Sequence, residues 1–349
     1  MNLLDNLDLI KHLDTEDMYH KIIHMPEHIL QAYNTPILHN YTNDESKTSN
    51  IEKIVICGMG GSAIAADLIK SLYNKQLTID VCKDYQLPFI NSKTLVITCS
   101  YSSETEETLS CLNQALEKTE HIWGVTTGGK LAETLSDKYP YLEIVKGFPP
   151  RSAIAYLFFS VLKILELNKL IASENVNVQK TAANLMMKAG AIAKSVPIIN
   201  NLAKSTSELM NNKIPLFYAS NPLLSPIAYR LKCQINENTK YPAFYHYSPE
   251  MNHNEIEAWE NQNFNNKFIP VFLRFFEEDI NYEKRLKVFK KLLTENGIEF
   301  IELFADGDNN ISRFFSLIYL GDMISFYLAI CNNTNPTTIN FINFLKKNI

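Results

Sequence analysis

The chain has 349 residues, of which 46% are hydrophobic and 20% are charged, with 33 Lys and Arg against 38 Asp and Glu. This is the composition of an ordinary globular protein, and it excludes a disordered chain, a collagen and a small disulfide scaffold. At roughly 100–200 residues per domain, the length predicts two domains that each bury a core of their own.

The charge balance and the apolar stretches narrow the class of protein further. A net charge of −5 leaves no basic excess to neutralise a run of phosphates, so nucleic-acid binding is not expected. The N-terminus lacks a basic n-region, which argues against secretion. The most apolar stretches, 154–167 and 314–330, fall short of the ~20 residues that span a bilayer. We expect buried core helices, no membrane partner and a cytoplasmic location.

The cysteines predict a reducing compartment. They form no C-x-x-C pair, and several lie inside apolar runs typical of strands or helices. We therefore expect free core thiols rather than a disulfide framework. The six residues are Cys57, Cys82, Cys99, Cys111, Cys233 and Cys331.

Along the chain, short β-branched runs alternate with longer helical stretches, which predicts parallel α/β units. In the first half we expect strands at 53–57, 77–81, 94–98, 121–126 and 141–145 and helices at 62–72, 104–116 and about 152–167. A polar stretch at 172–178 then separates these elements from those of the second half. In the second half we expect strands at 214–219, 243–246, 268–273 and 299–304 and helices near 227–235, 282–294 and 311–329.

The two halves share a local pattern, in which a hydrophobic strand ends in a small-residue turn and enters a helix. This repetition indicates an old duplication. We predict an α/β fold of two doubly wound, flavodoxin-like domains with parallel sheets flanked by helices. The expected division is a helical N-terminal segment at 1–45, a first domain at 46–172, and a second domain with a C-terminal helix at 173–349.

The first segment with chemical meaning is the glycine-rich turn at 58–63, between a predicted strand and a predicted helix. Glycines allow a sharp turn, and the free N–H groups at a helix start favour an anion. Gly58, Gly60 and Ala63 also satisfy the dinucleotide fingerprint G-x-G-x-x-A, with Asp80 or Asp84 as the acid that this motif requires. A tight turn without any ligand is a third interpretation.

The second segment, 98–108, follows another predicted strand and also leads into a helix. Its hydroxyls can donate hydrogen bonds to a phosphate while the helix dipole stabilises the charge. The alternative is a helix N-cap with surplus serines. Because a nicotinamide dehydrogenase has no need of this second loop, the two loops together favour a phosphate site. The hydroxyls belong to Ser100, Ser102, Ser103 and Thr105.

These segments resemble the bifunctional phosphoglucose/phosphomannose isomerases, which are built from two sugar isomerase (SIS) domains. The sequence departs from the family at Ala63 and Ala66, where glycine is usual, and at Ser103-Glu104, where Gly-Asn is usual. The resembling stretches, in family order, are GMGGSAIAAD (58–67), SYSSETEET (100–108), PPRSA (149–153), QINENTKYPA (234–243), NHNEIEAW (252–259) and SLIYLGDMISFYLAI (316–330).

The resemblance implies roles for the two loops and for one arginine. Arg151 is implied to lie beside the sugar, where a fixed charge could steady an enediolate or orient a water. On its own, Arg151 indicates a surface salt bridge after a Pro-Pro turn. The residues implied to bind the sugar phosphate are Gly60, Gly61, Ser62, Ser100, Ser102 and Thr105.

Aldose–ketose isomerisation needs a base that carries a proton between C1 and C2, and a second acid/base that opens the sugar ring. The resemblance makes Glu237 the proton-transferring base. It makes His253 the ring-opening group, which reaches the site of a neighbouring subunit in a homodimer. Without the resemblance, Glu237 would be interpreted as a solvated residue at a helix end.

The C-terminal segment 336–347 resembles the closing Pro-Thr and Leu-Lys pattern of the family. Thr337 or Thr338 is implied to leave room for the C2 epimer, and Lys346 or Lys347 is implied to be catalytic. The alternative is an amphipathic terminal helix whose lysines are favoured by the helix dipole.

His20, His24 and His28 recur every four residues, a spacing that could align metal ligands on a helix. Pro26 interrupts that helix, and no acidic residue or cysteine completes the set, so we expect neither a metal nor a cofactor.

The function expected is a cytosolic, metal-independent isomerase that interconverts glucose 6-phosphate, and also mannose 6-phosphate, with fructose 6-phosphate through a cis-enediol. Two alternatives stay open. A sugar-phosphate sensor would keep the serine loop, although the acidic N-terminus supplies no basic recognition helix. An NAD-dependent dehydrogenase would hold a pyrophosphate at the glycine turn.

Overall fold

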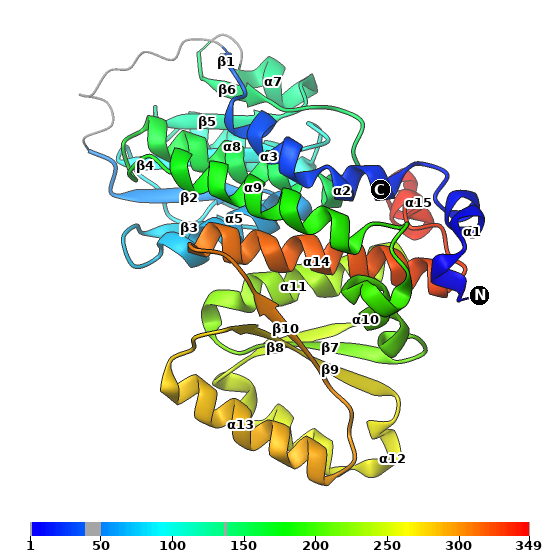
Figure 1. Ribbon diagram of the computed structural model, residues 1–349. Coiled ribbons are helices and arrows are strands. Elements are labelled where there is room, and N and C mark those ends of the chain that lie inside the picture. Colours follow the sequence, from blue (N-terminus) through cyan, green and yellow to red (C-terminus); the bar gives the residue numbers. More distant parts are fainter. Residues whose placement is uncertain (1, 39–49, 136–137, 349) are drawn as a thin grey trace. The chain divides into compact units, whose positions relative to one another are not determined.

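The computed structural model describes residues 2–38, 50–135 and 138–348, which fold into two compact units (Figure 1). One unit spans Met25–Ala182 and contains a sheet of six strands; we call it the six-stranded unit. The other combines Met1–His24 with Ala183–Ile349 and contains a sheet of four strands; we call it the four-stranded unit.

The six-stranded sheet is parallel except at one edge, where β1 pairs antiparallel with β6. The inner strands β2, β4 and β5 are almost wholly buried, as expected for a parallel sheet that is covered on both faces. In spatial order the strands are β1 (Ile37–Leu38), β6 (Tyr141–Glu143), β5 (Ile122–Thr126), β4 (Thr94–Ser100), β2 (Lys53–Cys57) and β3 (Ile79–Cys82).

Helices cover both faces of this sheet. Val55 and Cys57 of β2 share a buried cluster with residues of α6 and α7, so the alternate residues Ile54 and Ile56 face the other way. The helices α3 and α5 both pack against α8. The helical elements are α3 (Met25–Tyr33), α5 (Gly61–Tyr73), α6 (Glu106–Leu116), α7 (Gly129–Leu135), the short η2 (Pro150–Ser152) and α8 (Ile154–Leu167).

The four-stranded sheet is parallel throughout, in the order β10 (Ile301–Ala305), β9 (Phe268–Phe275), β7 (Ile214–Ala219) and β8 (Phe244–Tyr247). Tyr218 and Phe272 of this sheet form a buried cluster with Phe289 of α13 (Ile280–Glu295). The remaining helical elements are η1 (Leu3–Asp5), α1 (Leu7–Leu13), α2 (Met18–Ile23), η3 (Ile198–Asn200), α10 (Leu202–Met210), η4 (Pro222–Leu224), α11 (Ser225–Gln234), η5 (Ile235–Thr239), η6 (Glu250–His253), η7 (Glu255–Glu260), α12 (Gln262–Asn265), α14 (Asn310–Cys331) and α15 (Asn340–Asn348).

Helix α14 is long and apolar enough to cross a membrane by length and composition alone, so the sequence argument from length was wrong for this helix. The helix has 22 residues, and 89% of its most apolar window is buried. It packs against α10, α11 and β10 of its own unit. The expectation of a buried core helix is therefore confirmed.

The α/β fold with parallel sheets is confirmed, and each expected strand forms with small shifts at its ends. The division of the chain differs from the expected one. The polar stretch at 172–178 leads into α9 (Asn175–Ile192), and the compact units divide inside that helix. The N-terminal segment expected at 1–45 is shared between the two units, and its part beyond residue 38 lies outside the described residues.

Candidate active site

The glycine turn after β2 requires glycine at three positions for separate reasons. Gly60 has a φ of +52°, which side chains with a Cβ rarely adopt. A Cβ on Gly58 would lie 2.9 Å from the carbonyl oxygen of Cys99, and one on Gly61 would lie 2.8 Å from that of Pro150. Helix α5 begins at Gly61, so its first N–H groups are directed at this turn.

Three hydroxyl groups form a triangle where β4 ends and α6 begins. Ser100 Oγ lies 3.0 Å from Thr105 Oγ1 and 3.4 Å from Ser102 Oγ, and the latter two are 3.1 Å apart. Thr105 is the N-cap residue of α6, yet its side chain makes no capping hydrogen bond. All three hydroxyls are thus gathered at a helix N-terminus, where the dipole favours an anion.

Arg151 lies on η2, next to the glycine turn. The close approach of Gly61 to Pro150 places the backbone of η2 against the start of α5. The Arg151 residue is only 4% exposed, which overturns the interpretation as a surface salt bridge.

Tyr101, which the sequence argument missed, joins this segment to the serine loop. Its hydroxyl donates to the carbonyl of Val145 at 2.9 Å and accepts from the N–H of Phe148 at 2.8 Å. Thr127 in turn donates to the carbonyl of Tyr101. The glycine turn, the hydroxyl triangle and Arg151 are therefore brought together within one unit.

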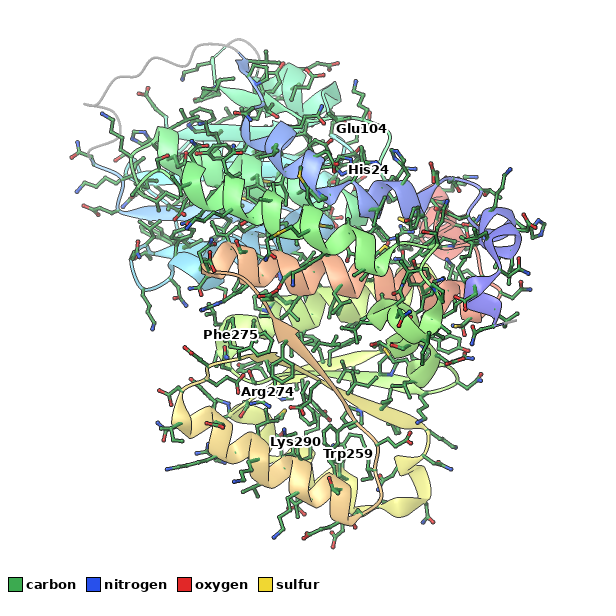
Figure 2. The ribbon with its side chains drawn as sticks, viewed as in Figure 1. His24, Glu104, Trp259, Arg274, Phe275 and Lys290 are labelled. Atoms are coloured by element: carbon green, nitrogen blue, oxygen red, sulfur yellow. The ribbon has the colours of Figure 1, made fainter. Side chains whose placement is uncertain are left out.

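The departure at Ser103-Glu104 has a local explanation. Ser103 has a φ of +64°, the left-handed conformation that favours the glycine usual in the family. Its hydroxyl donates to the carbonyl of Ser102, a local bond that a glycine could not make. The Glu104 side chain, labelled in Figure 2, is exposed. It precedes the first turn of α6, where Glu106 and Glu107 add two more acidic groups.

Glu237 lies on a π-helical turn, η5, that continues α11. Such turns are rare and occur often at functional sites. The residues around Glu237 are fixed: Asn238 donates to Ser325 Oγ of α14 at 2.8 Å, and Asn236 donates to the carbonyl of Tyr241 at 2.8 Å. Glu237 itself is half-buried, so its backbone is held while its carboxylate stays partly accessible.

Lys240 connects this turn to the C-terminal threonines. It is in the left-handed conformation, and its Nζ donates to the carbonyls of Glu237 at 2.9 Å and of Asn335 at 2.8 Å. Asn335 Oδ1 in turn accepts from the N–H of Thr337 at 2.8 Å. Thr337 is buried and Thr338 is half-buried. The sequence argument missed Lys240, since nothing in the local pattern marks its conformation.

His253 ends η6 and is exposed. The segment that follows His253 is held by Tyr218 of β7. The Tyr218 hydroxyl donates to Glu255 Oε1 at 2.7 Å and accepts from Trp259 Nε1 at 3.2 Å. Trp259 is labelled in Figure 2. Burial, with the nearby Glu255 carboxylate, raises the pKa of Tyr218 well above its usual range, so the phenol stays neutral.

Lys346 is the predicted site residue for which the structure gives least support. It lies in the last turn of α15, a helix without a buried residue. The hydrogen bonds described above for the Thr337 segment come from Asn335 and Lys240. Glu237, His253, Thr338 and Lys346 all belong to the four-stranded unit, whereas the phosphate loops and Arg151 belong to the six-stranded unit.

The histidines expected not to bind a metal are held by packing. Pro26 does not interrupt a longer helix, because α2 ends at Ile23 and α3 begins at Met25. The rings of His20 and His24 contact each other with centroids 3.8 Å apart and planes tilted by 30°, and His24 is labelled in Figure 2. His28 packs against Phe148 and Tyr156 instead.

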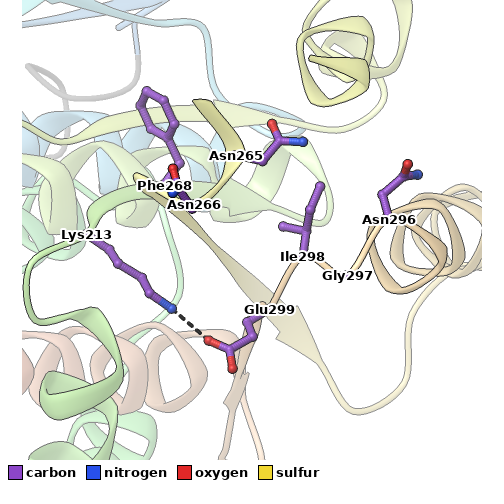
Figure 3. A pocket seen from close by; sticks show the side chains of 8 residues that line it. All are labelled: Lys213, Asn265, Asn266, Phe268, Asn296, Gly297, Ile298 and Glu299. Carbon is purple, nitrogen blue, oxygen red and sulfur yellow. Dashed lines mark hydrogen bonds and ion pairs between the residues drawn. The ribbon is translucent and has the colours of Figure 1, made fainter. Parts of the chain in front are cut away.

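A cavity of about 420 Å³ in the four-stranded unit is lined by none of the predicted site residues (Figure 3). It is at the amino-terminal ends of β7, β9 and β10, where Lys213 forms an ion pair with Glu299 at 2.7 Å. Ligands of doubly wound sheets bind at the carboxyl ends of the strands. We therefore do not assign the active site to this cavity.

Comparisons with known proteins agree on the kind of protein. Residues 199–349 match the family model described as the bacterial phospho-glucose isomerase C-terminal SIS domain. The chain is 34% identical over 339 residues to a bifunctional phosphoglucose/phosphomannose isomerase of Caldicellulosiruptor bescii, which covers 95% of this chain and 98% of that relative.

Two further similarities bear on the chemistry and on the fold. A D-glucosamine-6-phosphate 4-epimerase of Sulfolobus acidocaldarius is also 34% identical, over 64% of this chain and 68% of that relative. The crystal structure of tagatose-6-phosphate ketose/aldose isomerase from Escherichia coli matches with a TM-score of 0.69 at 14% identity, over 91% of this chain and 94% of that chain. This last likeness concerns the fold alone.

Proposed function

Because the chain belongs to the family of bifunctional phosphoglucose/phosphomannose isomerases, we propose that it interconverts glucose 6-phosphate and mannose 6-phosphate with fructose 6-phosphate. The observation that carries the proposal is the triangle of hydroxyls at the start of α6 beside the glycine turn. It offers donors and a favourable dipole to a phosphate dianion in a chain that has no basic excess.

In this proposal the phosphate accepts hydrogen bonds from Ser100, Ser102 and Thr105, and from the N–H groups around Gly60, Gly61 and Ser62. Arg151 supplies a full positive charge to the loop cluster. A buried guanidinium keeps its charge, so it stabilises the oxygens of an enediolate as they become negative. These groups hold the sugar; they transfer no proton themselves.

The proton transfer belongs to Glu237 in this proposal. Its carboxylate takes the proton from C2 of the open-chain aldose, the electron pair of that C–H bond forms the C1–C2 double bond of the cis-enediol, and the carbonyl pair moves onto O1. O1 takes up a proton, O2 gives one up, and the proton held by Glu237 is returned to C1 to give the ketose. The π-helical turn, Lys240 and Asn238 support this role because they hold the backbone of Glu237 and leave its side chain partly accessible.

His253 opens the sugar ring as acid and base, and Thr338 leaves room for the C2 epimer. The enediol can then be reprotonated at C2 on either face, which gives glucose 6-phosphate or mannose 6-phosphate. We further propose a cytoplasmic homodimer in which the exposed His253 acts at the partner's site. Lys346 is retained as a catalytic residue on the strength of the resemblance alone.

The test is a coupled assay of the conversion of fructose 6-phosphate to glucose 6-phosphate and to mannose 6-phosphate. We expect both products from the unaltered protein, and a loss of at least ~100-fold in kcat for Glu237→Gln, as is usual for a general base. Glu277→Gln, an exposed carboxylate of the same unit, is the control and should keep its activity.

Three results would overturn the proposal. If neither aldose forms and glucosamine 6-phosphate is epimerised instead, the activity is that of the epimerase relative. If sugar phosphates bind without any turnover, the chain is a sensor. A thermal shift with NAD in the absence of sugar phosphate would indicate the dehydrogenase alternative.

A further inference from the structure

Three of the six cysteines converge beneath the glycine turn, at a place that the proposed reaction does not use. Cys57 and Cys82 are the last residues of β2 and β3 and are paired in register, and Cys111 approaches from α6. Their Sγ atoms all lie within 4.8 Å of one another, and those of Cys82 and Cys111 are 3.6 Å apart. The three residues are 0%, 6% and 1% exposed.

Backbone carbonyls complete the surroundings of the three sulfurs. The carbonyl oxygen of Asp84 lies 3.2 Å from Cys111 Sγ and 3.8 Å from Cys82 Sγ. That of Gln86 lies 3.2 Å from Cys82 Sγ. The cluster therefore presents sulfur and oxygen donors from two strands, a helix and a loop.

The loop that carries these carbonyls is fastened to α6. The carbonyl of Tyr85 accepts from Ser110 Oγ at 2.9 Å and from Gln114 Nε2 at 2.7 Å, and Gln114 Oε1 accepts from the N–H of Leu87 at 3.2 Å. Because both sides of the loop are held, the oxygens of Asp84 and Gln86 are fixed in place over the thiols.

We propose that Cys57, Cys82 and Cys111 form a binding site for a thiophilic divalent cation of the zinc class, with the carbonyl oxygen of Asp84 as a fourth ligand. Tetrahedral zinc with Zn–S bonds of about 2.3 Å requires sulfurs about 3.8 Å apart. The separation of 3.6 Å between Cys82 and Cys111 is close to that value, and the remaining separations allow it after small rotations of the side chains.

Binding would convert three thiols to thiolates and release three protons to solvent, leaving a centre with one net negative charge. Hydrogen bonding within the cluster acts in opposite directions, since it raises the pKa of Cys57 and lowers that of Cys82, so the cation itself supplies the driving force for ionising all three thiols. Cys99 shows the contrasting case of a thiol buried alone, since desolvation raises its pKa to about 12. A disulfide would use only two of the three sulfurs.

The site would also stabilise the phosphate-binding edge of the sheet. Cys57 directly precedes Gly58, whose N–H donates to the carbonyl of Cys82 at 3.1 Å. A cation that ties β2, β3 and α6 together would therefore fix the start of the glycine turn. The inference does not depend on the identity of the sugar substrate.

The experiment uses the full chain, reduced, stripped of metal with a chelator and kept without oxygen. We expect one equivalent of Co²⁺ to give thiolate-to-cobalt charge-transfer absorption and the visible bands of a tetrahedral ion, with three protons released per ion. Zn²⁺ should displace it and raise the Tm. Cys111→Ser and Cys82→Ser should weaken binding by at least ~100-fold, since even the outer partners of metal ligands contribute 10- to 100-fold.

Cys99→Ala, which removes an equally buried thiol outside the cluster, is the matched control and should bind normally. The Tm values of the metal-free variants show whether each one folds, and the spectra and proton count of the unaltered chain need no variant at all. Absence of charge-transfer bands, binding unchanged in Cys82→Ser, or loss of two thiols to a disulfide without metal uptake would each overturn the proposal.

Discussion

The two sheets share a strand order, but the turns at the carboxyl ends of their strands carry different side chains. In the six-stranded unit, β2 and its neighbour β4 lead into the glycine turn and the hydroxyl triangle. In the four-stranded unit, β7 and its neighbour β9 hold the corresponding places. There the turns are Ser220-Asn221-Pro222 and the acidic run Glu277-Glu278-Asp279.

The polar side chains at the carboxyl end of the four-stranded sheet already form hydrogen bonds within their own turns. Asn221 accepts from the N–H of Leu223 and donates to Ser220 Oγ, while Pro222 has no N–H to offer. Glu278 accepts from the N–H of Phe275, and Asp279 caps α13. A helix start thus supplies a dipole in both units, but the residues decide whether an anion can be bound there.

Acidic groups in the four-stranded unit serve its stability instead. Glu302 of β10 accepts hydrogen bonds from Arg274 of β9 at 2.7 Å and from Lys290 of α13 at 2.8 Å. Both cations are labelled in Figure 2. These bonds join two strands and a helix of one unit, and Arg274 also forms an ion pair at 3.5 Å with Glu278 of the acidic carboxyl-edge turn.

We expect the largest effect on the phosphate-binding edge from Gly61→Ala. The new Cβ would meet the carbonyl of Pro150 at 2.8 Å and push η2, with Arg151, away from the glycine turn. We expect kcat/KM for fructose 6-phosphate to fall about 100-fold, as a displacement of about 1 Å in a site can cause. The control is Gly190→Ala in α9, where a Cβ meets nothing within 4 Å, and the measurement is steady-state kinetics with Tm values for both.

If Gly61→Ala keeps its activity at an unchanged Tm, Arg151 is not positioned by this contact. Gly190→Ala should raise the stability, by up to about 1 kcal/mol, because alanine is the better helix former.

A smaller effect on KM tests directly which of the two sheets binds the phosphate. Ser100→Ala removes one corner of the hydroxyl triangle, and we expect KM to rise about 10-fold or more, since a hydrogen bond to a charged group contributes about 1.5–3 kcal/mol. Ser220→Ala, a similarly buried serine after β7, should leave KM unchanged. Isothermal titration with 6-phosphogluconate or inorganic phosphate measures the same difference without turnover. Equal effects of the two variants would contradict the assignment of the phosphate to the six-stranded unit.

The smallest expected effect concerns the acid in the serine loop. Glu104→Gln removes a negative charge near the proposed phosphate, and we expect KM to fall about two- to fivefold at low salt, because exposed charges interact by about 1 kcal/mol at 4 Å in water. This decrease in KM should become smaller at ionic strengths above ~0.15 M, because salt screens the charge of Glu104. Kinetics at two salt concentrations measure it. A gain that does not depend on salt would mean that Glu104 acts through the loop conformation.

The local patterns predicted the elements well, because β-branched runs and small-residue turns determine strands and their ends without help from distant residues. Strands β2 and β7 have the expected bounds. The edge strand β1 could not be found, since two residues carry no period, and α9 was not expected because its polar first turn is typical of a linker. The left-handed conformation of Lys240 could not be predicted either, because its Nζ donates to the carbonyl of Asn335, which lies far along the chain.

The α/β class, the two phosphate-loop candidates and the family could be predicted from the sequence, since they depend on residue types in local order. Which of the segments lie together follows from the tertiary structure. It buried Arg151 beside Gly61, joined the serine loop to Val145 and Phe148 through Tyr101, and brought Cys57, Cys82 and Cys111 together from separate elements. The reason is physical: contacts between distant residues follow from strand order and helix packing, which no local pattern encodes.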